Sequence, residues 1–159
     1  MLKVKLIVLG KLKEKYWADA AKEYIKRLSG YCKIEVCEIR DLPVPENPCE
    51  GEIETILSKE ADEIIRQLGT VRNVISLCIE GKSISSEELS ELLGNAEMNG
   101  GSIAFIIGSS HGLHEKVKRL STGRISFSKM TFPHQLARIM LLEQIYRGFK
   151  IKKGENYHK

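Results

Sequence analysis

The sequence predicts an α/β protein whose mostly parallel sheet is covered by helices on both faces. Short apolar runs with strand character alternate with segments of helical periodicity, and the connections between them are short. The runs at residues 73–79 and 102–107 are almost continuously apolar, as expected for strands buried on both faces of such a sheet. No shift in composition divides the chain, so one domain is expected over residues 1–159.

Local signals set the limits of each expected element. Gly10 ends the first strand, Gly30 ends the first helix, and prolines between residues 43 and 48 mark an irregular connection. Ser85 and Glu88 have the spacing of a capping box at a helix start. Strands are expected at residues 2–9, 33–39, 73–79, 102–107 and 125–127. Helices are expected at residues 16–28, 52–68, 86–98, 113–120 and 133–150.

The charge of the chain is unevenly distributed. Residues 1–110 hold 14 basic and 18 acidic side chains, whereas residues 111–159 hold 11 basic and 3 acidic ones. A concentrated positive field is expected for a protein that binds a polyanion such as a nucleic acid; a solvated lysine-rich surface is the alternative. No apolar run is long enough to cross a membrane or to form the core of a signal peptide, so a cytoplasmic protein is expected.

The cysteine and histidine residues give no disulfide or metal-site pattern. The four cysteines include no C-x-x-C pair and are expected to be free, mostly buried thiols. His111 and His114 are three residues apart but lack a third ligand at a recognisable spacing, so no metal site is predicted.

Three predicted strands lead into turns rich in small residues, at 77–81, 107–114 and 127–133. Because the carboxyl ends of parallel strands meet at one edge of the sheet, these turns are expected to line one crevice. The chain lacks G-x-x-x-x-G-K-[ST] and G-x-G-x-x-G, and Ser110 does not lie in a G-x-S-x-G elbow. A P-loop NTPase, an ordinary dinucleotide site and a serine nucleophile are therefore disfavoured. The remaining interpretation is a site for a nucleoside-sized ligand, held by backbone amides between apolar walls.

The last predicted helix is apolar around most of its circumference, which indicates burial on more than one side. One side is expected to cover the sheet and another to form a two-fold dimer interface; full burial within one chain is the alternative. Glu143 and Arg147, four residues apart, can pair on this helix or face a site. The basic tail beyond it is either a frayed terminus or an arm that substrate orders.

Three stretches carry a resemblance to a known family: residues 125–135 (ISFSKMTFPHQ), 142–151 (LEQIYRGFKI) and 157–159 (YHK). They are similar to the RlmH family of SPOUT-class methyltransferases, which methylates N3 of a pseudouridine in large-subunit (23S) ribosomal RNA. The resemblance implies a C-terminal trefoil knot, a homodimer, and S-adenosylmethionine as cofactor. By position, it implies cofactor contacts at Leu77, Gly108, Phe127, Ser128, Lys129, Met130, Thr131 and Phe132. Ser109 departs from the second glycine that is common in relatives, and its side chain is expected to narrow the approach to the cofactor.

The resemblance also implies a reaction. A sulfonium methyl group is intrinsically reactive, so the protein has to orient the imide nitrogen of the pseudouridine and exclude water. The imide proton must also leave, and Arg147 and His158 are the favoured residues for this step, with Glu143 as a candidate base. Tyr157 is expected to stack on a base.

A partner follows from the same resemblance. Basic side chains near the carboxyl end are expected to anchor RNA phosphates, namely Lys116, Lys118, Arg119, Arg124, Lys152 and Lys153. Because so small an enzyme has no separate RNA-binding domain, its expected substrate is the assembled ribosome. A non-enzymatic ribosome- or RNA-binding module on the same fold is the alternative.

Overall fold

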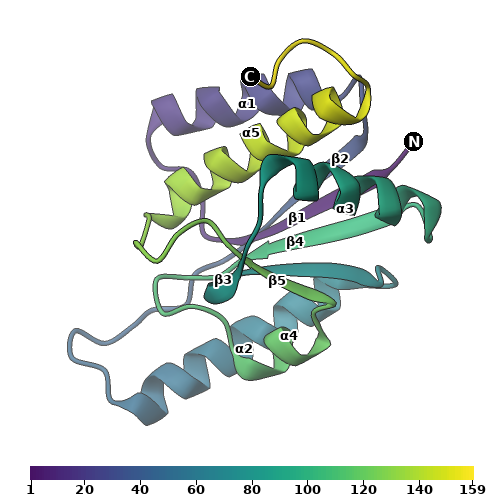
Figure 1. Ribbon diagram of the computed structural model, residues 1–159. Helices are drawn as coiled ribbons and strands as arrows, with labels where there is room; N and C mark the ends of the chain where they lie inside the picture. Colours follow the sequence, from purple (N-terminus) through teal and green to yellow (C-terminus); the bar gives the residue numbers. More distant parts are fainter.

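The structure is a computed structural model that describes all residues from 1 to 159. Five strands form one sheet in the order β2-β1-β4-β3-β5, and every neighbouring pair is parallel (Figure 1). The strands are β1 (Lys3–Leu9), β2 (Lys33–Ile39), β3 (Asn73–Ser83), β4 (Ser102–Ile107) and β5 (Gly123–Ser126). The helices are α1 (Lys15–Leu28), α2 (Glu50–Leu68), α3 (Ser86–Met98), α4 (Glu115–Leu120) and α5 (His134–Lys152). The predicted α/β class with a parallel sheet is confirmed.

The sheet separates two apolar layers. Val4, Leu6 and Val8 of β1 pack with α1, α3 and α5, whereas Ile7 and Leu9 pack with α2 and α4 on the opposite face. Figure 1 shows these two groups of helices on the two sides of the sheet. The side chains of a strand alternate between the faces, so β1 has to be apolar on both. None of the helices is long and apolar enough to span a membrane.

Helix α5 lies between α1 and α3 on one face of the sheet (Figure 1). Leu141, Leu142 and Ile145 on this helix are fully buried. A Cβ at Gly148 would lie 2.9 Å from Leu93 Cδ1, and the Gly148 carbonyl accepts a 2.7 Å hydrogen bond from Ser90 Oγ. The close packing of α3 and α5 therefore requires a glycine here. The sheet and helices α1 and α3 therefore bury α5 on several sides, as predicted for this helix. A dimer interface on α5 stays a prediction.

The observed limits agree with the predicted ones to within two residues for every element except β3. The capping box at the start of α3 is confirmed, because Ser85 Oγ accepts a hydrogen bond from the Glu88 amide at 3.1 Å. The Glu88 carboxylate in turn accepts one from the Ser85 amide at 2.7 Å.

Strand β3 continues to Ser83, through the segment that the sequence predicted to be a turn. The register shifts between Leu77 and Lys82, and beyond this bulge Lys82 and Ser83 pair with Ile125 and Ser126 of β5. The prediction of a free turn at 77–81 was wrong, because a bulge absorbs the irregular residues and lets the strand resume. Gly81 is required at this place, since a Cβ would lie 2.6 Å from the carbonyl carbon of Ile125.

Candidate functional site

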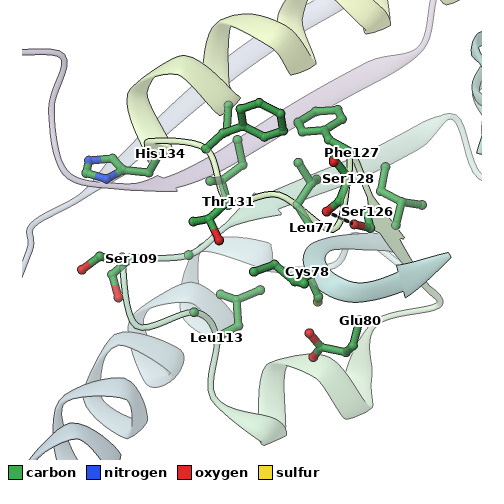
Figure 2. Close-up of a pocket in the computed structure, with 18 of the residues that line it drawn as sticks. Leu77, Cys78, Glu80, Ser109, Leu113, Ser126, Phe127, Ser128, Thr131 and His134 are labelled. Carbon is green, nitrogen blue, oxygen red and sulfur yellow. Dashed lines mark hydrogen bonds between the residues drawn. The ribbon is translucent and has the colours of Figure 1, made fainter. Parts of the chain in front are cut away.

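A pocket of about 710 Å³, called the edge pocket below, opens at the carboxyl edge of the sheet. Its volume is in the range of small-molecule sites. Its walls come from three segments, which are the bulged end of β3, the loop between β4 and α4, and the loop between β5 and α5 (Figure 2). The predicted convergence of these three segments on one crevice is confirmed.

Residues 127–133, called the lip, join β5 to α5 above the pocket (Figure 2). Ser126 Oγ donates a 3.0 Å hydrogen bond to the Ser128 carbonyl, and Ser128 Oγ accepts one of 3.0 Å from the Met130 amide. Such local hydroxyl-to-backbone bonds hold a chain in a turn. The small and hydroxyl residues that precede Phe132 therefore shape the lip.

The loop after β4 is a tight turn that needs two glycines. The Gly112 amide donates a 2.9 Å hydrogen bond to the Ser109 carbonyl, and Gly112 has a positive φ of 86°. A Cβ at Gly108 would lie 2.4 Å from the Gly112 carbonyl oxygen. Without side chains at these positions, the backbone closes on itself and a ligand can approach it.

A buried carboxylate on α2 supports this turn. Glu60 is only 5% exposed, and its Oε1 accepts a 3.2 Å hydrogen bond from Ser109 Oγ. Burial raises the pKa of Glu60, the Ser109 hydrogen bond opposes this rise, and the charge of Asp41 adds to it. The Ser109 hydroxyl is therefore bound toward α2, and this contact accounts for a serine in place of the expected glycine.

Glu60 was not among the predicted site residues, although a pattern in the sequence pointed to it. Ile56, Leu57, Ala61 and Ile64 form the apolar face of α2, and Glu60 lies on that same face at helical spacing. A carboxylate among core positions has to find a partner, because an unpaired buried charge is costly.

The edge pocket is almost uncharged. Glu80 and Lys118 are the only acidic or basic residues of the Asp, Glu, Lys and Arg types that line it, and they pair with each other. The Lys118 hydrogen bond lowers the pKa of Glu80. Burial raises the pKa of the Cys78 thiol, so at neutral pH Cys78 is a protonated, apolar part of the wall.

Seven of the eight predicted cofactor-contacting residues line the edge pocket, namely Leu77, Gly108, Phe127, Ser128, Met130, Thr131 and Phe132. Figure 2 shows Leu77 and Cys78 from β3, Thr131 from the lip and Leu113 around the same space. The eighth, Lys129, is exposed and does not line the pocket. The lip turns its side chain outward, toward solvent.

The four predicted catalytic residues form a second group, called the tail cluster below. Arg147 donates to Glu143 Oε1 from Nη2 at 2.6 Å and from Nε at 3.0 Å, and the Tyr157 hydroxyl donates to the same oxygen at 3.2 Å. Arg147 Nη1 lies 3.3 Å from His158 Nδ1, and the guanidinium lies 4.7 Å from the centre of the Tyr157 ring. The tail is thus folded back onto α5.

Charge and burial in the tail cluster act on its pKa values. The hydrogen bond to Glu143 raises the pKa of Arg147, so the guanidinium stays charged. Burial raises the pKa of Tyr157, and the Glu143 charge adds to the rise, so the phenol stays neutral. His158 Nε2 lies 2.8 Å from Glu87 Oε1, which ties the tail to the start of α3.

The tail cluster does not line the edge pocket of the same chain. Glu143 instead borders a second hollow of about 450 Å³, whose other walls include Ile139, Met140 and Tyr24. Residues 125–127 line both hollows and stand between them. The residues that the resemblance assigns to one reaction therefore form two adjacent sets in the structure.

The predicted phosphate anchors differ in how free their charges are. Lys116, Lys118 and Lys152 each pair with a carboxylate, those of Asp62, Glu80 and Glu97 respectively. Arg124 Nε donates to the Lys118 carbonyl, and Arg119 and Lys153 form no ion pair. To bind RNA, half of the six predicted anchors would therefore have to replace a carboxylate partner with a phosphate.

Comparisons with known proteins agree with this geometry. The model of a family described as Predicted SPOUT methyltransferase matches residues 2–158. The structure is similar to a probable methylase family protein from Haemophilus influenzae Rd KW20 (TM-score 0.57, 12% identity), covering 98% of this chain and 70% of that one.

Two further solved structures are similar. A probable methyltransferase from Bordetella pertussis Tohama I has a TM-score of 0.58 and 13% identity, with 92% of this chain and 93% of that chain covered. The tRNA (m1G37) methyltransferase from Aquifex aeolicus has a TM-score of 0.54 and 16% identity, with 91% and 69% covered. At these identities the likeness establishes a shared fold.

Proposed function

Because the chain belongs to the SPOUT methyltransferase family, we propose that it transfers a methyl group from S-adenosylmethionine to N3 of a pseudouridine in 23S ribosomal RNA. The observation that supports this most is the edge pocket, where seven predicted cofactor positions from three separate segments meet. The choice of pseudouridine and of its N3 atom rests on the resemblance of residues 125–135, 142–151 and 157–159 to the RlmH family.

The edge pocket suits S-adenosylmethionine by its chemistry. The only Lys or Arg side chain that lines it, Lys118, is already paired with Glu80, so the pocket favours a nucleoside without phosphates. Leu77, Phe127 and Phe132 would hold the adenine ring by apolar contact. The amides of the turn at 108–112 would bind its polar atoms. When bound, S-adenosylmethionine supplies an electrophilic methyl group on its sulfonium sulfur.

The tail cluster would act on the nucleophile. Glu143 accepts four hydrogen bonds, two from Arg147 and one each from Tyr157 and Gln144, so its lone pairs are largely engaged. This disfavours Glu143 as the base and supports a role for it in fixing Arg147. We assign to Arg147 the stabilisation of the negative charge that develops on the nucleobase, and to Tyr157 stacking on the nucleobase. His158 would remove the imide proton once its ring leaves Arg147 and Glu87, because those contacts engage both of its ring nitrogens here.

The separation of the two sets of residues within one chain supports a homodimer as part of the proposal. Half-buried Ile139 and Met140 of α5 line the second hollow, where a second copy could cover them. In a two-fold assembly through α5, the tail cluster of one protomer would complete the edge pocket of its partner. Equilibrium sedimentation tests this arrangement, because a monomer at assay concentration would contradict it.

The path of the chain belongs to the same proposal. We infer that residues 1–159 act as one methyltransferase domain, in which the carboxyl-terminal segment passes through an earlier loop as a trefoil knot. Membership of the SPOUT methyltransferase family supports such a crossing. All elements of residues 1–159 belong to one sheet and its covering helices, which leaves no separate RNA-binding domain among them. We therefore propose that the substrate is RNA presented by the assembled ribosome, and this partner would place the protein in the cytoplasm.

Calorimetric titration with S-adenosylmethionine, followed by methyl transfer from radiolabelled cofactor, tests the proposed function. We expect the cofactor to bind and 70S ribosomes to be methylated, with a short free hairpin methylated poorly. Mass mapping of 23S RNA from a deletion strain should then locate one missing methyl group on a pseudouridine. A protein that binds ribosomes but not the cofactor would instead be a non-enzymatic RNA-binding module.

A further inference from the structure

The loop between β1 and α1, which carries two lysines and one glutamate (Glu14), lies beside the edge pocket, and the proposed function does not use it. We propose that this loop, residues 10–14 and called the β1–α1 arm below, binds the RNA phosphate backbone through Lys11 and Lys13. The proposal rests on the proposed function for its choice of RNA as the polyanion. It adds a named contact surface and explains how substrate could be held next to the pocket.

Two side chains of α5 hold the arm in place. Gln135 Oε1 accepts a 3.3 Å hydrogen bond from the Lys13 amide. Arg138 donates to the Gly10 carbonyl at 2.9 Å and to Glu38 Oε2 at 2.8 Å, and it is only 3% exposed. The arm is therefore fixed at both ends of its basic segment, which lowers the entropy cost of binding.

The attachment of the arm places it at the mouth of the edge pocket. His134, the residue before Gln135, lines that pocket, and Figure 2 shows the β1–α1 loop passing beside its ring. Both Lys11 and Lys13 are exposed. RNA that reaches the pocket would thus pass next to two ammonium groups.

The ammonium groups of the two lysines in the arm have no carboxylate partner. Lys11 and Lys13 form no ion pair, in contrast to Lys116, Lys118 and Lys152. A paired lysine gives up a carboxylate when it binds a phosphate, so part of its gain is lost. A free lysine exchanges only water and counterions, which makes it the better electrostatic anchor.

An exposed aromatic residue follows the arm closely in the chain. Tyr16, at the start of α1, is 64% exposed, and its ring centre lies 5.0 Å from that of Trp17. Surfaces that bind single-stranded nucleic acid combine lysines with exposed aromatic rings: the lysines neutralise phosphates and the rings stack on bases. Tyr16 gives the arm a stacking platform that an isolated lysine pair would lack.

The salt dependence of binding tests the proposal. Full-length protein is titrated with 70S ribosomes and, separately, with a fluorescent single-stranded oligouridylate over a series of salt concentrations. The double variant K11A/K13A should reduce the slope of log affinity against log salt by about 1.4–1.8, which corresponds to two lost phosphate contacts. Its affinity for S-adenosylmethionine should equal that of the wild type.

The matched control is K3A/K33A. Lys3 and Lys33 are also exposed and unpaired. They lie opposite each other at the amino ends of β1 and β2, whereas the arm begins at the carboxyl end of β1. This control should leave the slope unchanged, although it removes the same charge. Equal reductions in the two double variants would overturn the proposal, because binding would then follow net charge alone.

A third variant tests the attachment of the arm. Gln135→Ala removes the acceptor for the Lys13 amide but no charge, so it should weaken RNA binding two- to threefold while the salt slope stays that of the wild type. Unchanged affinity in this variant would argue against a fixed arm. A wild-type protein that does not bind S-adenosylmethionine refutes the proposed function, whereas the slopes still decide whether the arm binds RNA.

Discussion

The close approach of β3 and β5 at Gly81 leads to a prediction whose size follows from distances. A Cβ in Gly81→Ala would lie 2.6, 2.7 and 2.8 Å from the carbonyl carbon, carbonyl oxygen and amide nitrogen of Ile125. Non-bonded carbon atoms prefer about 3.5–4.0 Å, so the new methyl group overlaps β5 by about 1 Å. The three atoms belong to the backbone, so no side-chain rotation relieves the overlap and β5 has to move.

The expected loss of stability combines two effects. Overpacking of a tight contact costs about 1–3 kcal/mol. A Gly→Ala change also restricts the unfolded chain, which offsets about 0.4–1 kcal/mol of that loss. The free energy of unfolding should therefore fall by about 1–2 kcal/mol, and the melting temperature by about 2–8 °C for a chain of this size. Because β5 leads directly into the lip, cofactor affinity should fall as well.

Urea unfolding and calorimetric titration with S-adenosylmethionine measure the two effects. Gly30→Ala is the matched control, because a Cβ there meets only the Arg27 carbonyl oxygen, at 3.9 Å. It should be as stable as the wild type or up to about 1 kcal/mol more stable, because the alanine restricts only the unfolded chain, and it should bind the cofactor equally well. If Gly81→Ala unfolds at the wild-type urea concentration and keeps its affinity, then the contact between Gly81 and Ile125 does not constrain the lip.

Three further predictions concern the core, the turn after β4 and the tail. Leu142→Ala removes a fully buried side chain; it should lower the free energy of unfolding by about 2–5 kcal/mol in urea, and a much smaller loss would mean that α5 is loosely packed. Burial raises the pKa of Glu60, so its contribution to stability is complete below the unfolded-state pKa and is lost as pH rises through the folded-state pKa. In urea unfolding at a series of pH values, the free energy of unfolding of the wild type should therefore fall relative to that of Glu60→Gln as pH rises from acidic to neutral. A difference between the two proteins that does not change with pH would contradict this. His158→Ala should lower turnover on ribosomes with calorimetric cofactor affinity unchanged; loss of that affinity would make the tail structural.

The periodicity of the sequence was sufficient to predict the sheet and its helices. Runs such as residues 102–107 are apolar because both faces of β4 are covered, and that requirement leaves a pattern in the sequence. The extension of β3 left none. Glu80, Gly81 and Lys82 have the composition of a turn, and only the backbone of β5, more than forty residues later in the chain, gives them a partner.

The candidate site was predictable where it depends on small residues at strand ends. Gly108 and Ser128 have small side chains because the turns around them require it. Such requirements depend on neighbouring residues in the chain and are therefore visible in the sequence. The division between the edge pocket and the tail cluster was not predictable in this way. It depends on the direction in which α5 presents Glu143 and on the path of the tail back to that helix, and both are set by packing against α1 and α3.

The position of α5 between α1 and α3 has a consequence for how the protein is made. Helix α5 follows all five strands in the chain, yet it covers the middle of one face of their sheet. During synthesis the strands emerge first, and Phe105, Leu6 and Ile145 cannot meet until residues 134–152 have left the ribosome. Until then the part of this face that lies between α1 and α3 has no cover. Folding of this layer should therefore be completed only after α5 has docked.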